Sequence, residues 1–67
     1  MLIPKYPDIQ VQLSGNDGNA ISIIGLCRKE ARAAKLDSTE FEVFVTEALS
    51  GNYNHLLQTC MKWFDVN

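Results

Sequence analysis

Residues 6–13 alternate between apolar and polar side chains. The apolar positions are Ile9, Val11 and Leu13, and the polar positions are Asp8, Gln10 and Gln12. A period of two places these sets on opposite faces of a β-strand. Pro4 and Pro7 favour extended backbone at its start. The pattern therefore predicts a half-buried strand near the N-terminus.

The period changes to that of a helix at Ala20, and the helical pattern continues to about Lys35. One face carries Ile24, Cys27, Ala31 and Ala34, with Ala20 and Ile23 beside it. Asn19 or Asp17 is the expected N-cap, because its side-chain oxygen can accept from an unpaired backbone N–H group. Gly25 costs on the order of 1 kcal/mol relative to alanine inside a helix. We therefore expect another element to approach closely at Gly25.

A second helix is predicted after Asp37-Ser38-Thr39-Glu40, which has the spacing of a capping box. Leu36 and Phe41 occupy the positions of a hydrophobic staple across this start. The helix then carries apolar residues at helical spacing, namely Phe41, Phe44, Val45, Ala48 and Leu49. Gly51 is the expected left-handed residue that terminates it.

A third helix is predicted from about His55 to Trp63, with Asn52 or Asn54 as its N-cap. Its apolar set is broad, which suits either a helix covered on several sides or one that also forms an interface. The set consists of Leu56, Leu57, Cys60, Met61, Trp63 and Phe64. A lone strand leaves backbone groups unpaired. Only residues 64–67 offer a second strand within the chain, and pairing with a second copy of the protein is the other solution.

Together these elements predict one domain, residues 1–67, of the α+β class. It is a small, mostly helical domain with an N-terminal strand followed by three helices and a candidate short C-terminal strand. A chain of 67 residues buries only about 60% of the surface that its unfolded form exposes, so self-association would add stability. No segment approaches the roughly 20 apolar residues of a membrane span, and Pro4 interrupts the apolar N-terminal residues of any signal peptide. We expect a cytoplasmic protein that makes no membrane contact.

The two cysteines, Cys27 and Cys60, lie far apart in the sequence and form no CxxC motif. A reducing compartment disfavours a disulfide between them. We therefore expect two buried free thiols. His55, the single histidine, would lie about 140° around a straight helix from Cys60, which is a poor geometry for a catalytic pair.

Charge and motifs argue against several function classes. Four of the six basic residues fall in residues 28–35, at Arg28, Lys29, Arg32 and Lys35. They form either a small patch for an anion or nucleic acid, or a set of cations that complements the dipole at a helix C-terminus. The net charge of −2 argues against nucleic-acid binding. The sequence contains no metal-binding motif and no phosphate-binding P-loop, so we expect no cofactor.

The tetrapeptide Leu-Ser-Gly-Asn occurs twice, at residues 13–16 and 49–52, and each copy precedes a predicted helix. Polar residues cluster around both copies. If the two loops meet, residues 14–19 and 50–55 could form a binding or catalytic site for a small ligand or anion, built from Asp17, Asn19, Tyr53 and His55. The alternative interpretation is that both loops only turn the chain and cap helices. Trp63 and Phe64 likewise indicate either an interface or simply the core.

Two sequence blocks resemble a family of short bacterial and phage proteins of uncharacterised function. The first block is LSGxDGNA, beginning at Leu13, and the second is SGxYxHLLxTCMxW, beginning at Ser50. The resemblance covers nearly the whole chain. It implies that the shared polar residues of the family lie in the same two loops, and it implies no mechanism.

The function predicted from these observations is that of a non-enzymatic protein-interaction module. Its partner would be another protein or a second copy of itself. This prediction rests on the small size, the strand that needs a partner and the broad apolar surface of the third helix. The site between the two polar loops is the alternative.

Overall fold

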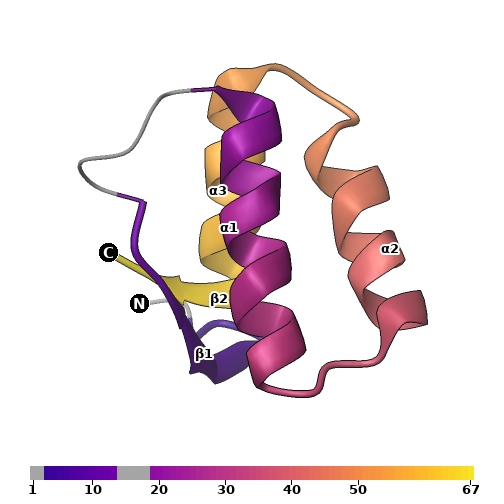
Figure 1. The fold of residues 1–67 in the computed structure, drawn as a ribbon. Coiled ribbons are helices and arrows are strands. Elements are labelled where there is room, and N and C mark those ends of the chain that lie inside the picture. The colour runs from indigo at the N-terminus through magenta and orange to yellow at the C-terminus, as the bar shows by residue number, and fades with distance from the viewer. Residues whose placement is uncertain (1–2, 14–18) are drawn as a thin grey trace.

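The computed structural model describes residues 3–13 and 19–67, which form two strands and three helices (Figure 1). Their order is β1 (Tyr6–Val11), α1 (Ala20–Ala33), α2 (Ser38–Ala48), α3 (Tyr53–Trp63) and β2 (Phe64–Val66). This is the predicted α+β class: an N-terminal strand, three helices and a short C-terminal strand.

The two strands pair in parallel within the chain, with Tyr6 opposite Phe64 and Val11 opposite Val66. The pairing continues beyond β2, because Leu13 N donates to the Asn67 carbonyl at 2.9 Å and Asn67 N donates to the Val11 carbonyl at 3.0 Å. The register shifts between Tyr6 and Gln10. Pro7, which has no N–H to donate, lies inside this irregular stretch. Of the two predicted ways to pair the first strand, the structure has the intramolecular one.

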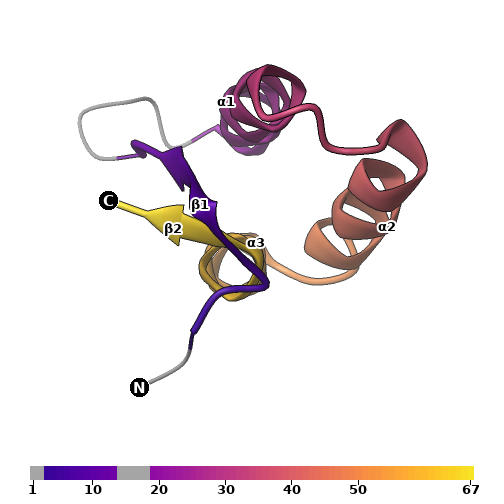
Figure 2. The ribbon, with the colours of Figure 1, turned by 90° about the horizontal axis from the view of Figure 1, so that it is seen from below.

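The helices pack side by side, with α1 and α3 running in one direction and α2 in the other (Figure 1). Figure 2 shows the sheet on the side away from α2, with α1 and α3 between. The core at the centre is strongly aromatic. The ring of Phe44 lies edge-on to both Trp63, at 5.5 Å between centroids, and Phe64, at 4.9 Å. Edge-to-face contacts of this kind add to the stability that burial provides.

Each helix begins at an asparagine or aspartate. Asn19 Oδ1 accepts from Ile21 N at 2.8 Å, Asp37 Oδ1 from Thr39 N at 3.3 Å, and Asn52 Oδ1 from His55 N at 2.9 Å. The third helix therefore starts at Tyr53, two residues earlier than predicted. These side chains satisfy N–H groups that have no partner inside the helix.

The predicted capping box at Asp37 is only half formed. Glu40 does not return to the Asp37 backbone, because its carboxylate accepts a hydrogen bond from the Tyr6 hydroxyl and lies 3.1 Å from Lys5 Nζ. A neighbouring strand thus supplies stronger partners than the N–H group of the cap. The contact ties the start of α2 to β1.

The ends of α1 and α2 differ from the prediction. Helix α1 ends at Ala33, and Lys35 takes the left-handed conformation with φ 63°. Leu36 N donates to the Ala31 carbonyl and Lys35 N to the Arg32 carbonyl, which is the Schellman arrangement. The prediction that Gly51 ends α2 in the left-handed conformation was wrong, because the φ of Gly51 lies outside the left-handed region.

Gly25 also differs from the prediction. A Cβ added there would meet no atom of the described chain within 4 Å, and Gly25 faces solvent. The expected close approach of another element at Gly25 is therefore wrong for the described residues. Glycine at this position lowers the stability of α1, and no described element uses the space that it leaves.

Candidate functional site

The imidazole of His55 joins the end of α2 to the beginning of α3. Its Nε2 lies 2.8 Å from the carbonyl oxygen of Glu47, 3.1 Å from Ser50 Oγ and 3.4 Å from Thr59 Oγ1. Ser50 Oγ donates to the same Glu47 carbonyl at 2.7 Å. The Glu47 carbonyl lies in the last turn of α2, where carbonyls lack a partner further along the helix, and these two side chains supply its hydrogen bonds.

The partners of Nε2 define the chemistry of the ring. A carbonyl oxygen only accepts hydrogen bonds, so Nε2 carries a hydrogen and donates a hydrogen bond to the backbone carbonyl of Glu47. A general base toward Ser50 would need an unprotonated Nε2, and the Ser50 hydroxyl already donates its own proton to the carbonyl. The arrangement is therefore that of a clamp between two helix ends.

Gly51 makes room for this clamp. A Cβ at Gly51 would lie 2.8 Å from both Cβ and Cγ of His55. These atoms are at the root of the side chain and cannot swing away as the tip of a flexible side chain can. Position 51 therefore requires glycine because the imidazole of His55 approaches it closely. The prediction had attributed this glycine to a left-handed turn.

The predicted four-residue site is brought together only in part. Helices α1 and α3 both begin at the upper end of the molecule in Figure 1, so Asn19 and Tyr53 lie at the same end. Asn19 caps α1 and His55 clamps α2 to α3, and among the described residues no hydrogen bond or ion pair links Asn19 to Tyr53 or His55. Asp17 lies outside the described residues. A site between the two loops stays a prediction.

Trp63 and Phe64 lie in the core. Their side chains are 6% and 0% exposed, and Trp63 Nε1 donates to Glu47 Oε2 at 2.7 Å. Of the two interpretations of these aromatics, the structure supports the core. The polar edge of Trp63 is satisfied inside the chain, as buried indole groups usually are.

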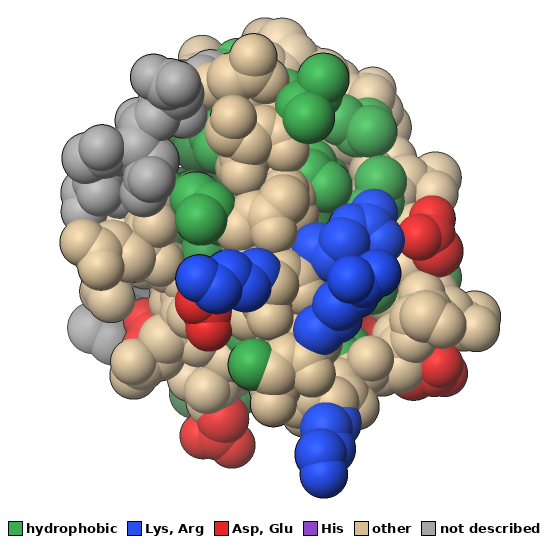
Figure 3. All heavy atoms as spheres, viewed as in Figure 1, with side chains coloured by type: hydrophobic (Ala, Val, Ile, Leu, Met, Phe, Trp, Pro, Cys, Tyr) green, Lys and Arg blue, Asp and Glu red, His purple; other side chains and the backbone are tan. Residues whose placement is uncertain are grey.

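Three large apolar side chains are exposed where α1 begins, α2 ends and α3 begins. They are Ile21 (82% exposed), Leu49 (57%) and Tyr53 (41%). We call these three residues the helix-end surface. Figure 3 shows hydrophobic side chains gathered on the upper part of one face of the molecule, above Lys and Arg side chains.

The helix-end surface also lies in the uncharged part of the chain. No Asp, Glu, Lys or Arg occurs in residues 18–27 or 48–61. The charged residues of the helices begin at Arg28 in α1 and at Lys62 in α3. The separation of charged from uncharged residues along α1 and α3 can be seen in the sequence. A search for motifs does not detect it.

Comparison with known proteins found no matching family model, no matching curated protein and no matching solved structure. Within residues 3–13 and 19–67, no group of three or more His, Cys, Asp or Glu side chains is placed to hold a metal ion. The helices in the same ranges are too short or too polar to cross a membrane.

Proposed function

We propose that this protein is a non-enzymatic interaction module that associates with a second copy of itself through the helix-end surface. The observation that carries the proposal is the exposure of Ile21, Leu49 and Tyr53 at the ends of the three helices. Aromatic and apolar side chains with few charges among them are typical of the core of a protein–protein interface.

A second copy fits this surface because the surface carries no charge. Two identical copies, each with a net charge of −2, repel one another over most orientations. The helix-end surface is self-complementary, since a two-fold contact places the same three uncharged residues on both sides. Contact through these residues therefore brings no like charges of theirs together.

Gly25 supports the same surface. It lies one helical turn after Ile21 and is exposed, with space where a Cβ would be. A glycine lets another backbone approach closely, and no element of the described chain uses this space. A helix of the second copy would supply the close approach that the sequence led us to expect.

The environment of the histidine and the two cysteines supports the non-enzymatic part of the proposal, because these are the side chains best suited to catalysis. The imidazole of His55 donates from Nε2 to a backbone carbonyl. Both thiols, Cys27 and Cys60, are buried. In the folded protein these three side chains therefore make structural contacts.

Sedimentation velocity tests the proposal, from about 10 µM to about 1 mM, where small interfaces associate. The wild-type protein should shift from monomer toward dimer with rising concentration. Ile21→Glu and Leu49→Glu should keep it monomeric. Met61→Glu is the matched control, because Met61 is 53% exposed and lies outside the helix-end surface. A wild-type monomer at every concentration overturns the proposal, as does equal weakening by Met61→Glu.

The variant Gly25→Ala tests whether the second copy contacts α1 at this glycine. Alanine should stabilise the helix by about 1 kcal/mol, because the added Cβ meets no atom of residues 3–13 and 19–67. The same Cβ should weaken the dimer, because it occupies the space that the second copy would approach. A more stable variant that still dimerises normally would remove Gly25 from the interface.

A further inference from the structure

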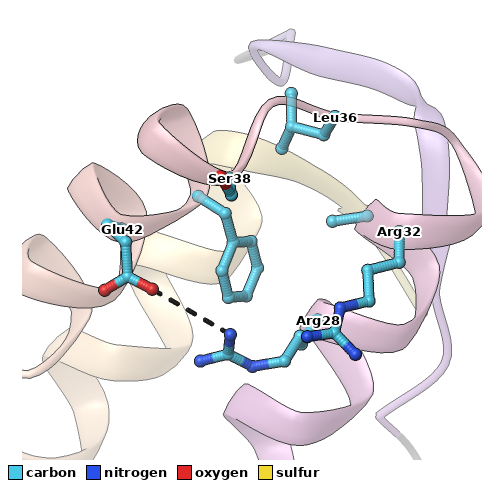
Figure 4. Close-up of a pocket in the computed structure, with 7 residues that line it drawn as sticks. Arg28, Arg32, Leu36, Ser38 and Glu42 are labelled. Atoms are coloured by element: carbon cyan, nitrogen blue, oxygen red, sulfur yellow. Dashed lines mark ion pairs between the residues drawn. The ribbon is translucent and has the colours of Figure 1, made fainter.

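A small pocket lies between the second half of α1 and the first turns of α2, away from the helix-end surface. Its volume is about 60 Å³. Figure 4 shows the side chains around it, with Arg28 and Arg32 from α1 on one side and Ser38 and Glu42 from α2 on the other. The polar part of its lining thus combines two cations, one hydroxyl and one carboxylate, and the rest of the lining is apolar.

Arg28 is held in place by packing more than by its ion pair. Its guanidinium carbon lies 5.0 Å from the centre of the Phe41 ring, which is a favourable cation–π distance. The nearest carboxylate oxygen, Glu42 Oε1, is 3.9 Å from Arg28 Nη1. That distance is too long for a hydrogen bond, so this carboxylate leaves the N–H donors of Arg28 available to a ligand.

Arg32 lies one helical turn after Arg28 and lines the same pocket. Among the described residues it forms no ion pair. Two like charges at this spacing on a helix destabilise each other, and an anion between them would remove that repulsion. The Ser38 hydroxyl, at the first residue of α2, also has no hydrogen-bond partner among the described residues, and it can donate a further hydrogen bond.

We propose that this pocket binds the phosphate group of a small molecule. Planar guanidinium groups match the oxygens of phosphate in pairs, and two of them with one hydroxyl suit a tetrahedral oxyanion better than a planar carboxylate. The volume admits a single such group, so the rest of the ligand lies outside. A nucleic-acid strand fits less well, because its adjacent phosphates would lie against a chain of net charge −2.

A titration followed by ¹H–¹⁵N correlation spectra tests the site at constant ionic strength. The probes are inorganic phosphate, glycerol 3-phosphate, acetate and a short DNA duplex. Phosphate and glycerol 3-phosphate should cause saturable shifts at Arg28, Arg32 and Ser38, and acetate should bind more weakly. Tighter binding of glycerol 3-phosphate would identify a phosphomonoester as the ligand, and equal binding would identify free phosphate. Preferred binding of DNA, or no saturable shift at these residues, overturns the proposal.

Charge-matched variants separate a built site from general attraction. Arg32→Gln should weaken phosphate binding about tenfold, as expected for loss of hydrogen bonds to a charged group. Lys29→Gln removes the same charge from the same helix outside the pocket, and should change binding by less than about twofold. Glu42→Gln should tighten binding, because it removes the competing carboxylate. Equal losses in Arg32→Gln and Lys29→Gln would overturn the proposal. These residues are separate from the helix-end surface, so either proposal can fail alone.

Discussion

The sulfur of Cys27, on α1, lies 3.9 Å from the sulfur of Cys60, on α3, and both thiols are fully buried. The hydrogen bond to Cys60 and burial raise the pKa of Cys27 well above its ordinary range. Only the thiolate reacts readily with disulfides and alkylating agents. Reagents reach neither sulfur without opening of the core, because both thiols are fully buried. The two residues are therefore expected to be inert in the folded protein.

This burial predicts slow thiol labelling. A small disulfide reagent should modify Cys27 and Cys60 at least about a hundredfold more slowly in buffer than in denaturant, because reaction requires opening of the core. Mass spectrometry of the labelled protein over time measures both rates. The two cysteines should be labelled together, since opening that exposes one removes the packing of the other. Rapid labelling of one cysteine in buffer would contradict the structure.

The contact between these two cysteines is a feature that the sequence alone does not predict. The helices and their caps were predictable because Asn19, Asp37 and Asn52 act on backbone groups two or three residues away. The Cys27–Cys60 contact joins residues 33 apart, and no local pattern encodes such a distance. The buried state of both thiols was predictable from residue type alone.

The same limit explains the errors at Glu40 and Gly51. Glu40 had the correct spacing for a capping box, but its partner, Tyr6, lies 34 residues earlier. Gly51 follows a helix, and a glycine there can serve either a left-handed turn or a close approach. The sequence does not distinguish these two roles, and only the position of the His55 ring decides between them. The pocket proposed to bind phosphate was predictable only in part. The run of basic residues on α1 indicated an anion patch, but the residues that α2 supplies lie on another element that no local pattern brings to it.

The bond between Tyr6 and Glu40 predicts a dependence of stability on alkaline pH. The hydrogen bond to Glu40, together with burial, raises the pKa of Tyr6 to about 12 from its ordinary value of 10.0. The bond therefore stabilises the fold fully below pH 10.0, and this contribution is lost as the pH rises toward 12. Absorbance of the tyrosinate in a Tyr53→Phe background should give the titration of Tyr6 alone.

Tyr6→Phe supplies the control for this pH dependence. The free energy of unfolding should fall more steeply between pH 10 and 12 in the wild type than in Tyr6→Phe, as measured by denaturant titration. On the acid side, the hydrogen bond from Tyr6 and the contact with Lys5 hold the pKa of Glu40 below its ordinary value. Its contribution should be lost as the pH falls through that lowered pKa. Identical alkaline slopes in the two proteins would show that the bond does not hold in solution.

Lys35 predicts a stabilising substitution at the end of α1. A side chain in the left-handed conformation costs roughly 1 kcal/mol or more, and glycine avoids this cost. Lys35→Gly should therefore raise the free energy of unfolding by about 1 kcal/mol, or the melting temperature by about 4–8 °C. Lys35→Gln removes the charge but keeps the strain, and should give no gain. Ala33→Gly, inside the helix, should lower stability by about 1 kcal/mol.

Gly51 predicts the opposite result in the loop between α2 and α3. Gly51→Ala places a Cβ 2.8 Å from Cβ and Cγ of His55, so the imidazole must move and its bond to the Glu47 carbonyl is lost. We expect a loss of about 1–3 kcal/mol, the range for forcing an extra methyl group into a packed site. His55→Ala should also destabilise, because the Glu47 carbonyl loses one of its hydrogen bonds and the link between α2 and α3 is removed. In the double variant Gly51→Ala, His55→Ala the new Cβ no longer meets Cγ and the rest of the ring, so the combined loss should be smaller than the sum of the single losses. Denaturant unfolding of the four proteins measures this coupling. Strict additivity would mean that Gly51 and His55 act independently, contrary to the clamp described above.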